Sequence, residues 1–164
     1  MATWGRCDFK QLKDLQERIQ KLEGTDFDAF CESCAKELAA RLLAKVIKRT
    51  PVGDYPSSTG KKGGTLRRGW TAKTESEAAS GGKADAKAYV NALPITKSGN
   101  MIQIEIINPV HYASYVEFGH RTRNHKGWVK GKFMLTISEQ ELDSQAPSIL
   151  ENKLKRYLGE CFNG

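Results

Sequence analysis

The chain lacks any apolar run of about 18 residues, the shortest stretch that crosses a bilayer as a helix, so we expect no membrane contact. A secretory signal is not expected either, because the polar start (Arg6, Asp8 and Lys10) has no apolar segment behind it. Apolar residues make up 39% of the 164, which is enough for the core of one compact domain. We therefore expect a protein that is made and kept in the cytoplasm, unless it leaves the cell within an assembly.

Cysteine is also scarce. A chain of this length with no export signal does not need its four cysteines for disulfides. Cys31 and Cys34 form a C-x-x-C pair, but no second pair follows, and both fall inside a helical pattern. We expect them to be small, partly buried helix residues, and we predict no metal and no cofactor.

Recognisable catalytic patterns are missing too, since the chain has neither H-E-x-x-H nor G-x-S-x-G. Gly60-Lys61 resembles part of a phosphate-binding loop, but Lys62 replaces the required Ser or Thr and no strand precedes it. His111, Glu117 and His120 leave open a hydrolase site assembled only in space, or are ordinary loop residues. We predict that the protein is not an enzyme and has no catalytic residue.

What the chain does have is positive charge, +7 in total, concentrated in two windows. Residues 51–73 carry five basic side chains and one acidic side chain, and residues 119–133 carry five basic and no acidic ones. Both windows contain stretches with the Gly-rich composition of loops. Such loops attract nucleic acid or an acidic protein surface, or are simply solvated.

Tryptophan accompanies the basic residues in both windows, at Trp70 and Trp128. This mixture resembles the surfaces of single-strand nucleic-acid binders, but Trp and Arg are also common in protein interfaces, and a Trp can simply belong to the core. The candidate residues for partner or DNA contact are Lys61, Lys62, Arg67, Arg68, Arg121, Arg123, Lys126, Trp128, Lys130 and Lys132.

The hydrophobic spacing predicts long helices near both ends of the chain and strands between them. Helices are expected over residues 8–23, over 25–49 up to Pro51, over 110–118 and 133–141, and from Ser144 or Gln145 onward. Strands are expected over residues 66–73, 88–93 and 101–107, with a long loop over 51–64 and a mobile linker over 75–87.

These elements predict an α+β fold, in which an antiparallel sheet of about three to four strands packs against a long N-terminal helix and a C-terminal helix, with long mobile loops. We expect an N-terminal helical extension over residues 1–24 and a single α+β domain over residues 25–164.

The order of several short motifs resembles the tail-component family of long-tailed bacteriophages and prophages, the neck or tail-completion proteins. The matching parts span residues 28–158. They are a helix ending in Thr50-Pro51-Val52-Gly53, a Gly/Ser-rich loop leading to residues 65–70 (TLRRGW), an isoleucine strand running into residues 108–119 (NPVHYASYVEFG), and a basic loop before residues 132–134 (KFM) and a terminal helix.

This resemblance implies a structural virion protein of the neck or tail, without catalysis. It also implies a homo-oligomeric ring at the head–tail junction, which joins head to tail beside other neck and tail proteins. In such a ring the basic loops would contact either passing DNA, without sequence preference, or an acidic neighbouring ring. A stand-alone basic nucleic-acid-binding domain is the alternative, and its DNA binding would depend steeply on salt.

Overall fold

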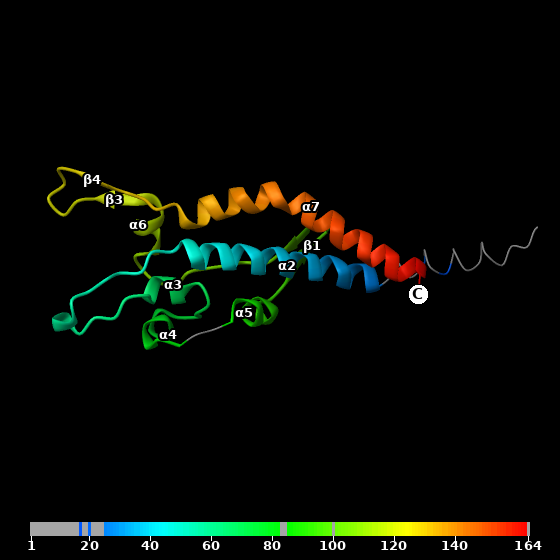
Figure 1. Ribbon diagram of the computed structural model, residues 1–164, viewed down its shortest axis with the longest axis horizontal. Helices are drawn as coiled ribbons and strands as arrows, with labels where there is room; N and C mark the ends of the chain where they lie inside the picture. Colours follow the sequence, from blue (N-terminus) through cyan, green and yellow to red (C-terminus); the bar gives the residue numbers. More distant parts are fainter. Residues whose placement is uncertain (1–16, 18–19, 21–24, 83–84, 100, 164) are drawn as a thin grey trace, which may run out of the picture.

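Two long helices, α2 (Thr25–Arg49) and α7 (Met134–Asn163), run side by side along the molecule, and the shorter elements gather beside them (Figure 1). The computed structural model describes residues 17, 20, 25–82, 85–99 and 101–163. The remaining elements are η1 (Ser57–Thr59), α3 (Thr65–Gly69), α4 (Glu75–Ser80), α5 (Ala86–Ala92), β1 (Thr96–Ser98), β2 (Met101–Gln103), α6 (Ala113–Phe118), β3 (Gly119–Arg121) and β4 (Trp128–Lys130). The predicted α+β class is confirmed.

Helix α2 follows the predicted pattern. Its apolar side chains recur every three or four residues, and Leu43 and Val46 are fully buried against the rest of the core. Lys48 and Arg49 lie in the last turn, where the helix dipole favours positive charge, and Pro51 then prevents continuation. The helix predicted over residues 8–23 lies outside the described residues, except for Glu17 and Gln20, which are helical.

Helix α7 is continuous, so the predicted division near Ser144 is wrong. Pro147 lies inside the helix and removes one main-chain hydrogen bond, but it is exposed, so water can satisfy the freed carbonyl group. Contacts with α2 hold the helix on both sides of this proline. They are Arg49 with Ser138 and Glu141, Lys45 with Glu141, Lys153 with Glu37, and the stacked rings of Phe30 and Tyr157. Tertiary packing therefore outweighs the local effect of the proline.

The strands form two antiparallel pairs rather than one larger sheet. β1 pairs with β2, with Thr96 opposite Gln103, and β3 pairs with β4, with Arg121 opposite Trp128. The predicted strand over residues 101–107 is thus paired only up to Gln103. Its alternation of half-buried and exposed side chains nevertheless continues through Ile107.

Two predicted strands and the predicted linker contain helices instead, which corrects the sequence-based assignment. Residues 65–69 form α3, because Leu66, Gly69 and Trp70 are buried at helical rather than alternating spacing. Residues 86–92 form α5, whose N-cap Asp85 accepts a hydrogen bond from the amide of Ala88 at 3.0 Å. The linker contains α4 over residues 75–80.

A buried hydrogen-bond network joins the end of α2 to α3. The indole Nε1 of Trp70 donates a 2.7 Å hydrogen bond to Thr50 Oγ1, and the Arg67 guanidinium donates two, at 3.0 and 2.7 Å, to the Thr50 carbonyl. Gly69 lies against Asn108 and Val110, where a Cβ would collide with the Asn108 side chain. The motifs around residues 50, 67–70 and 108 therefore meet in the core and hold the loops that leave it.

Candidate functional site

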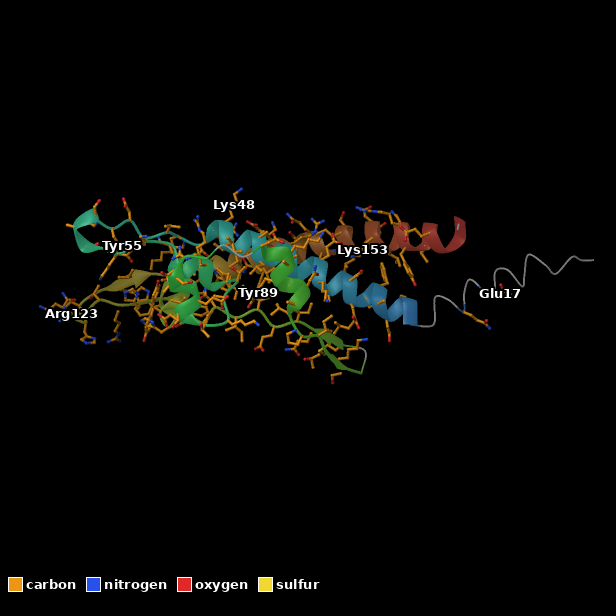
Figure 2. The ribbon with its side chains drawn as sticks, turned by 90° about the horizontal axis from the view of Figure 1, so that it is seen from below. Glu17, Lys48, Tyr55, Tyr89, Arg123 and Lys153 are labelled. Carbon is orange, nitrogen blue, oxygen red and sulfur yellow. The ribbon has the colours of Figure 1, made fainter. Side chains whose placement is uncertain are left out.

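Two loops project from the same end of the elongated molecule: residues 51–64, which contain η1, and the β3–β4 hairpin (Figures 1 and 2). Tyr55 on the first loop and Arg123 on the hairpin are both labelled at this end in Figure 2. Residues 51–62 are exposed throughout, as are most residues of the hairpin. We call this part of the molecule, residues 51–64 and 119–132, the basic end.

The hairpin is fixed at its base by the buried carboxylate of Glu117. Its Oε2 accepts a hydrogen bond from the amide of Leu135 at 2.9 Å. Its Oε1 accepts hydrogen bonds from the Thr136 amide at 2.9 Å and the Thr136 hydroxyl at 2.8 Å. A carboxylate in this position satisfies free amides at the start of α7 and complements the helix dipole. Glu117 therefore ties α6 to α7 across the base of the hairpin.

Close main-chain packing completes this base. The amides of Lys132 and Phe133 donate to the carbonyls of Val116 and Glu117, at 2.8 and 3.0 Å. At Gly119, φ is +88°, a conformation that side chains disfavour. A Cβ on Gly119 or Gly131 would collide with the backbone of the opposing segment. The two glycines thus allow the hairpin to leave the body as a tightly paired ribbon.

The register of the hairpin sorts its side chains onto two faces. Arg121 lies opposite Trp128, and Lys130 lies opposite Gly119, so Arg121, Trp128 and Lys130 share one face. His120 and Val129 occupy the other face, where the His120 ring meets Tyr115 edge-on at a centroid distance of 6.0 Å. The side chain of Trp128 is 62% exposed, although tryptophan is usually highly buried. One face of the hairpin is therefore both basic and aromatic.

The cations of the basic end have no acidic partner among the described residues. No salt bridge involves any of the seven lysines and arginines there, which are Lys61, Lys62, Arg121, Arg123, Lys126, Lys130 and Lys132. The only acidic residue in the two loops is Asp54. By contrast, several basic side chains along α2 and α7 are paired, such as Lys45 and Arg49 with Glu141.

Arg67 and Arg68, which the sequence places among the contact candidates, lie apart from this group. Both are half-buried, and their guanidinium groups bond to the main chain of their own subunit. Arg67 contacts the Thr50 carbonyl, and Arg68 contacts the carbonyls of Ala78 at 2.7 Å and Gly63 at 3.3 Å. Their geometry gives them a structural task, while their predicted role in partner contact stays a prediction.

The residues of the hydrolase hypothesis have separate partners. His111 Nδ1 lies 2.7 Å from Glu75 Oε1, and this contact lowers the pKa of the Glu75 carboxyl. Glu117 caps α7, and His120 packs on Tyr115. No hydrogen bond or ion pair joins any two of His111, Glu117 and His120 in the described structure.

The thiols of Cys31 and Cys34 are free within the described ranges, and burial raises the pKa of Cys34. Residues 25–82, 85–99 and 101–163 contain no cluster of three or more His, Cys, Asp or Glu that could hold a metal ion. In the same part of the chain, no helix combines the length and the apolar character needed to span a bilayer.

The described part of the chain is thus a small α+β domain, and the lysines and arginines of its basic end form no salt bridge there. Residues 13–119 match the protein family described as "Bacteriophage HK97-gp10, putative tail-component", so the chain belongs to this bacteriophage tail-component family. The resemblance read from the sequence is thereby confirmed. The match begins before residue 28 and ends at Gly119, so it leaves out residues 120–132 of the hairpin and helix α7. No curated protein and no solved structure matches the chain.

Proposed function

We propose that this tail component assembles with copies of itself into a ring at the head–tail junction, where it joins head to tail. Family membership makes it a structural protein of a phage tail, and hence part of the virion. The proposal adds the position in the neck, the ring, and contact with other neck and tail proteins. It is supported by a surface that is incomplete in the single chain and that a neighbouring copy would complete.

This incomplete surface is the extended segment of residues 104–107. Strand pairing ends at Gln103, and none of the main-chain hydrogen bonds outside the helices and strands of the described chain involves residues 104–107. Residues 104–107 belong to neither of the two antiparallel strand pairs of the described chain. Unpaired main-chain groups of an extended segment form a template for one more strand.

An apolar groove of about 330 Å³ accompanies this segment. Ile102, Ile104 and Ile106 form one wall, and apolar side chains of α2 and α7, including Leu38, Leu42 and Leu142, form the other. A strand that adds to residues 104–107 would gain main-chain hydrogen bonds, and its alternate side chains would enter the groove. We propose that a neighbouring copy supplies this strand. Such a contact joins two different surfaces of neighbouring copies, and it closes a ring when the rotation between subunits allows it.

A proline substitution tests this contact at a residue that is exposed in the single subunit and whose amide is in none of the main-chain hydrogen bonds outside the helices and strands of the described chain. Ile107 is 56% exposed, and Ile107→Pro removes its amide donor while leaving the groove intact. Ile107→Thr is the matched control, because it keeps the amide and suits an extended strand. We expect the threonine variant to assemble like the wild type and the proline variant to remain small, as measured by light scattering with circular dichroism as a check of folding.

The possible outcomes separate the functional candidates. A ring that forms equally well with Ile107→Pro would refute strand addition at this segment. A wild-type protein that stays monomeric with every neck and tail partner, yet binds DNA in low salt, would refute the ring. That second result would favour the stand-alone basic nucleic-acid-binding domain.

A further inference from the structure

The lysines and arginines of the basic end do not stabilise the described fold through salt bridges. Seven cations lie on two loops that project from the same end of the molecule, and none forms a salt bridge within the described residues. Structural arginines behave differently in this protein, since Arg67 and Arg68 bond to buried carbonyls. Five of the seven cations lie within the single hairpin, and like charges concentrated in one segment repel one another, so this arrangement costs stability unless an external anion compensates it.

A regular array of negative charge is the partner that fits this pattern. Double-stranded DNA presents one phosphate charge per about 1.7 Å of its axis, and lysine and arginine side chains neutralise these charges without reading sequence. The β3–β4 ribbon adds an exposed Trp128 between Arg121 and Lys130 on a single face. Two-stranded ribbons of this kind are narrow enough to enter the major groove of DNA.

We infer that the basic end binds the phosphate backbone of duplex DNA through Lys61, Lys62, Arg121, Arg123, Lys126, Lys130 and Lys132. Arg67 and Arg68 take no part, because both guanidinium groups are already engaged inside the subunit. The inference rests on the proposed function and deepens it, because DNA would pass through a ring at the head–tail junction. In a ring, each copy would present the same two loops to the DNA.

Glu117 and the paired glycines matter for this site because they hold the ribbon in place. The hydrogen bonds of Glu117 to the start of α7, and the close main-chain approach at Gly119 and Gly131, fix the base of the hairpin to the two-helix body. A fixed ribbon presents its cations without first having to become ordered, so less affinity is lost on binding. Glu117 is therefore a positioning residue for the hairpin and does not itself contact DNA.

The number of phosphates contacted sets the salt dependence of binding. Seven neutralised phosphates give a slope of about −6 in a plot of log affinity against log salt concentration, from about −0.9 per contact. Removing three contacts should reduce the slope by about 3. In salt of about 0.1 M, the same loss should weaken binding by two to three orders of magnitude.

The experiment compares two triple variants of the full chain that lose the same amount of charge. The test variant changes three cations of the hairpin: Arg121→Gln, Arg123→Gln and Lys126→Gln. The control variant changes three exposed cations on the helical body for which no salt bridge is found: Lys48→Gln, Lys87→Gln and Arg156→Gln. Binding of a fluorescently labelled duplex of random sequence is followed by anisotropy across a salt series. The mass of each protein is measured by light scattering in the same buffers.

We expect the test variant to show the weaker affinity and the shallower slope, while the control variant keeps the slope of the wild type. Equal losses in both variants would show a general effect of net charge and would overturn the site. A test variant with unchanged DNA binding that no longer joins its head or tail partner would also overturn it, because the cations would then serve a protein contact. The mass measurement reports separately on the ring, so the two proposals can fail independently.

Discussion

The hydrogen bonds that Glu117 accepts at the start of α7 give the sharpest prediction about stability. In Glu117→Gln the side chain keeps its shape, but one carboxylate oxygen becomes an NH₂ group that cannot accept a hydrogen bond. The amides of Leu135 and Thr136 are then not both satisfied, because each bonds to a different oxygen of Glu117. Losing a hydrogen bond to a charged group costs about 1.5–3 kcal/mol. Losing a negative charge at a helix N-terminus adds about 0.3–1 kcal/mol.

We therefore expect Glu117→Gln to lower the free energy of unfolding by about 2–4 kcal/mol. Glu117→Ala should cost about 3–5 kcal/mol, because it leaves two amides and the Thr136 hydroxyl without their acceptor. For a chain of this length, each kcal/mol corresponds to about 2–4 °C in melting temperature. The assay is thermal and urea unfolding followed by circular dichroism, at one protein concentration because assembly also stabilises the folded state.

The control for this series is Asp143→Asn. Asp143 is an exposed carboxylate on the same helix, and no hydrogen bond or salt bridge to its side chain is found in the described structure. It should change stability by less than about 0.5 kcal/mol. If Glu117→Gln is no more destabilising than Asp143→Asn, the reasoning that α7 and the hairpin depend on this carboxylate is refuted.

Two further predictions concern the core and the contact between α2 and α7. Trp70→Phe should lower the free energy of unfolding in urea by about 1–3 kcal/mol, because it removes the indole hydrogen bond to buried Thr50. In a protein that already carries Thr50→Val this hydrogen bond is absent, so Trp70→Phe should then cost less. An equal cost in both backgrounds would contradict this explanation. Lys45 and then Arg49 lower the pKa of the Glu141 carboxyl, so its stabilising effect is present above the ordinary carboxyl pKa and is lost as the pH falls through the lowered value. The free energy of unfolding of Glu141→Gln should therefore fall less with acid than that of the wild type. Equal acid sensitivity in the wild type and Glu141→Gln would contradict a stabilising role for the contacts of Glu141 with Lys45 and Arg49.

The sequence was sufficient for the elements with a long, regular hydrophobic pattern. Helix α2 follows its predicted bounds, because its apolar residues repeat at helical spacing over many turns and Pro51 stops it. The alternation of residues 101–107 was also readable, since Ile102, Ile104 and Ile106 share one side. The sequence did not reveal that only Met101–Gln103 finds a partner strand, because pairing depends on which segments are nearby in space.

The short helices were missed although capping signals were present. Thr74 accepts a hydrogen bond from the amide of Glu77 at 3.2 Å, and the Glu77 carboxylate accepts one from the amide of Lys73 at 2.8 Å. A Thr followed three residues later by Glu is typical of a helix start. Ser, Gly and Ala nearby gave these residues the composition of a linker, and that composition outweighed the capping signal.

The candidate site was partly visible in the sequence. The two basic windows were found from charge alone, and the structure brings their loops to one end of the molecule (Figure 2). Charge could not separate the exposed cations from Arg67 and Arg68, because only the fold shows that their partners are carbonyl groups. From the sequence, Glu117 is a candidate residue of a hydrolase site together with the histidines. Its structural role is not predictable there, since no local pattern links it to amides 18 and 19 residues further along.

The most direct test of the central proposal is the mass of the purified full-length protein in solution. Light scattering at low and high concentration, alone and with a neck or tail partner, reports whether copies assemble. We expect a discrete closed oligomer of fixed mass, formed either alone or in the presence of the partner, and this mass would give the number of subunits. A monomer under all of these conditions would contradict the ring.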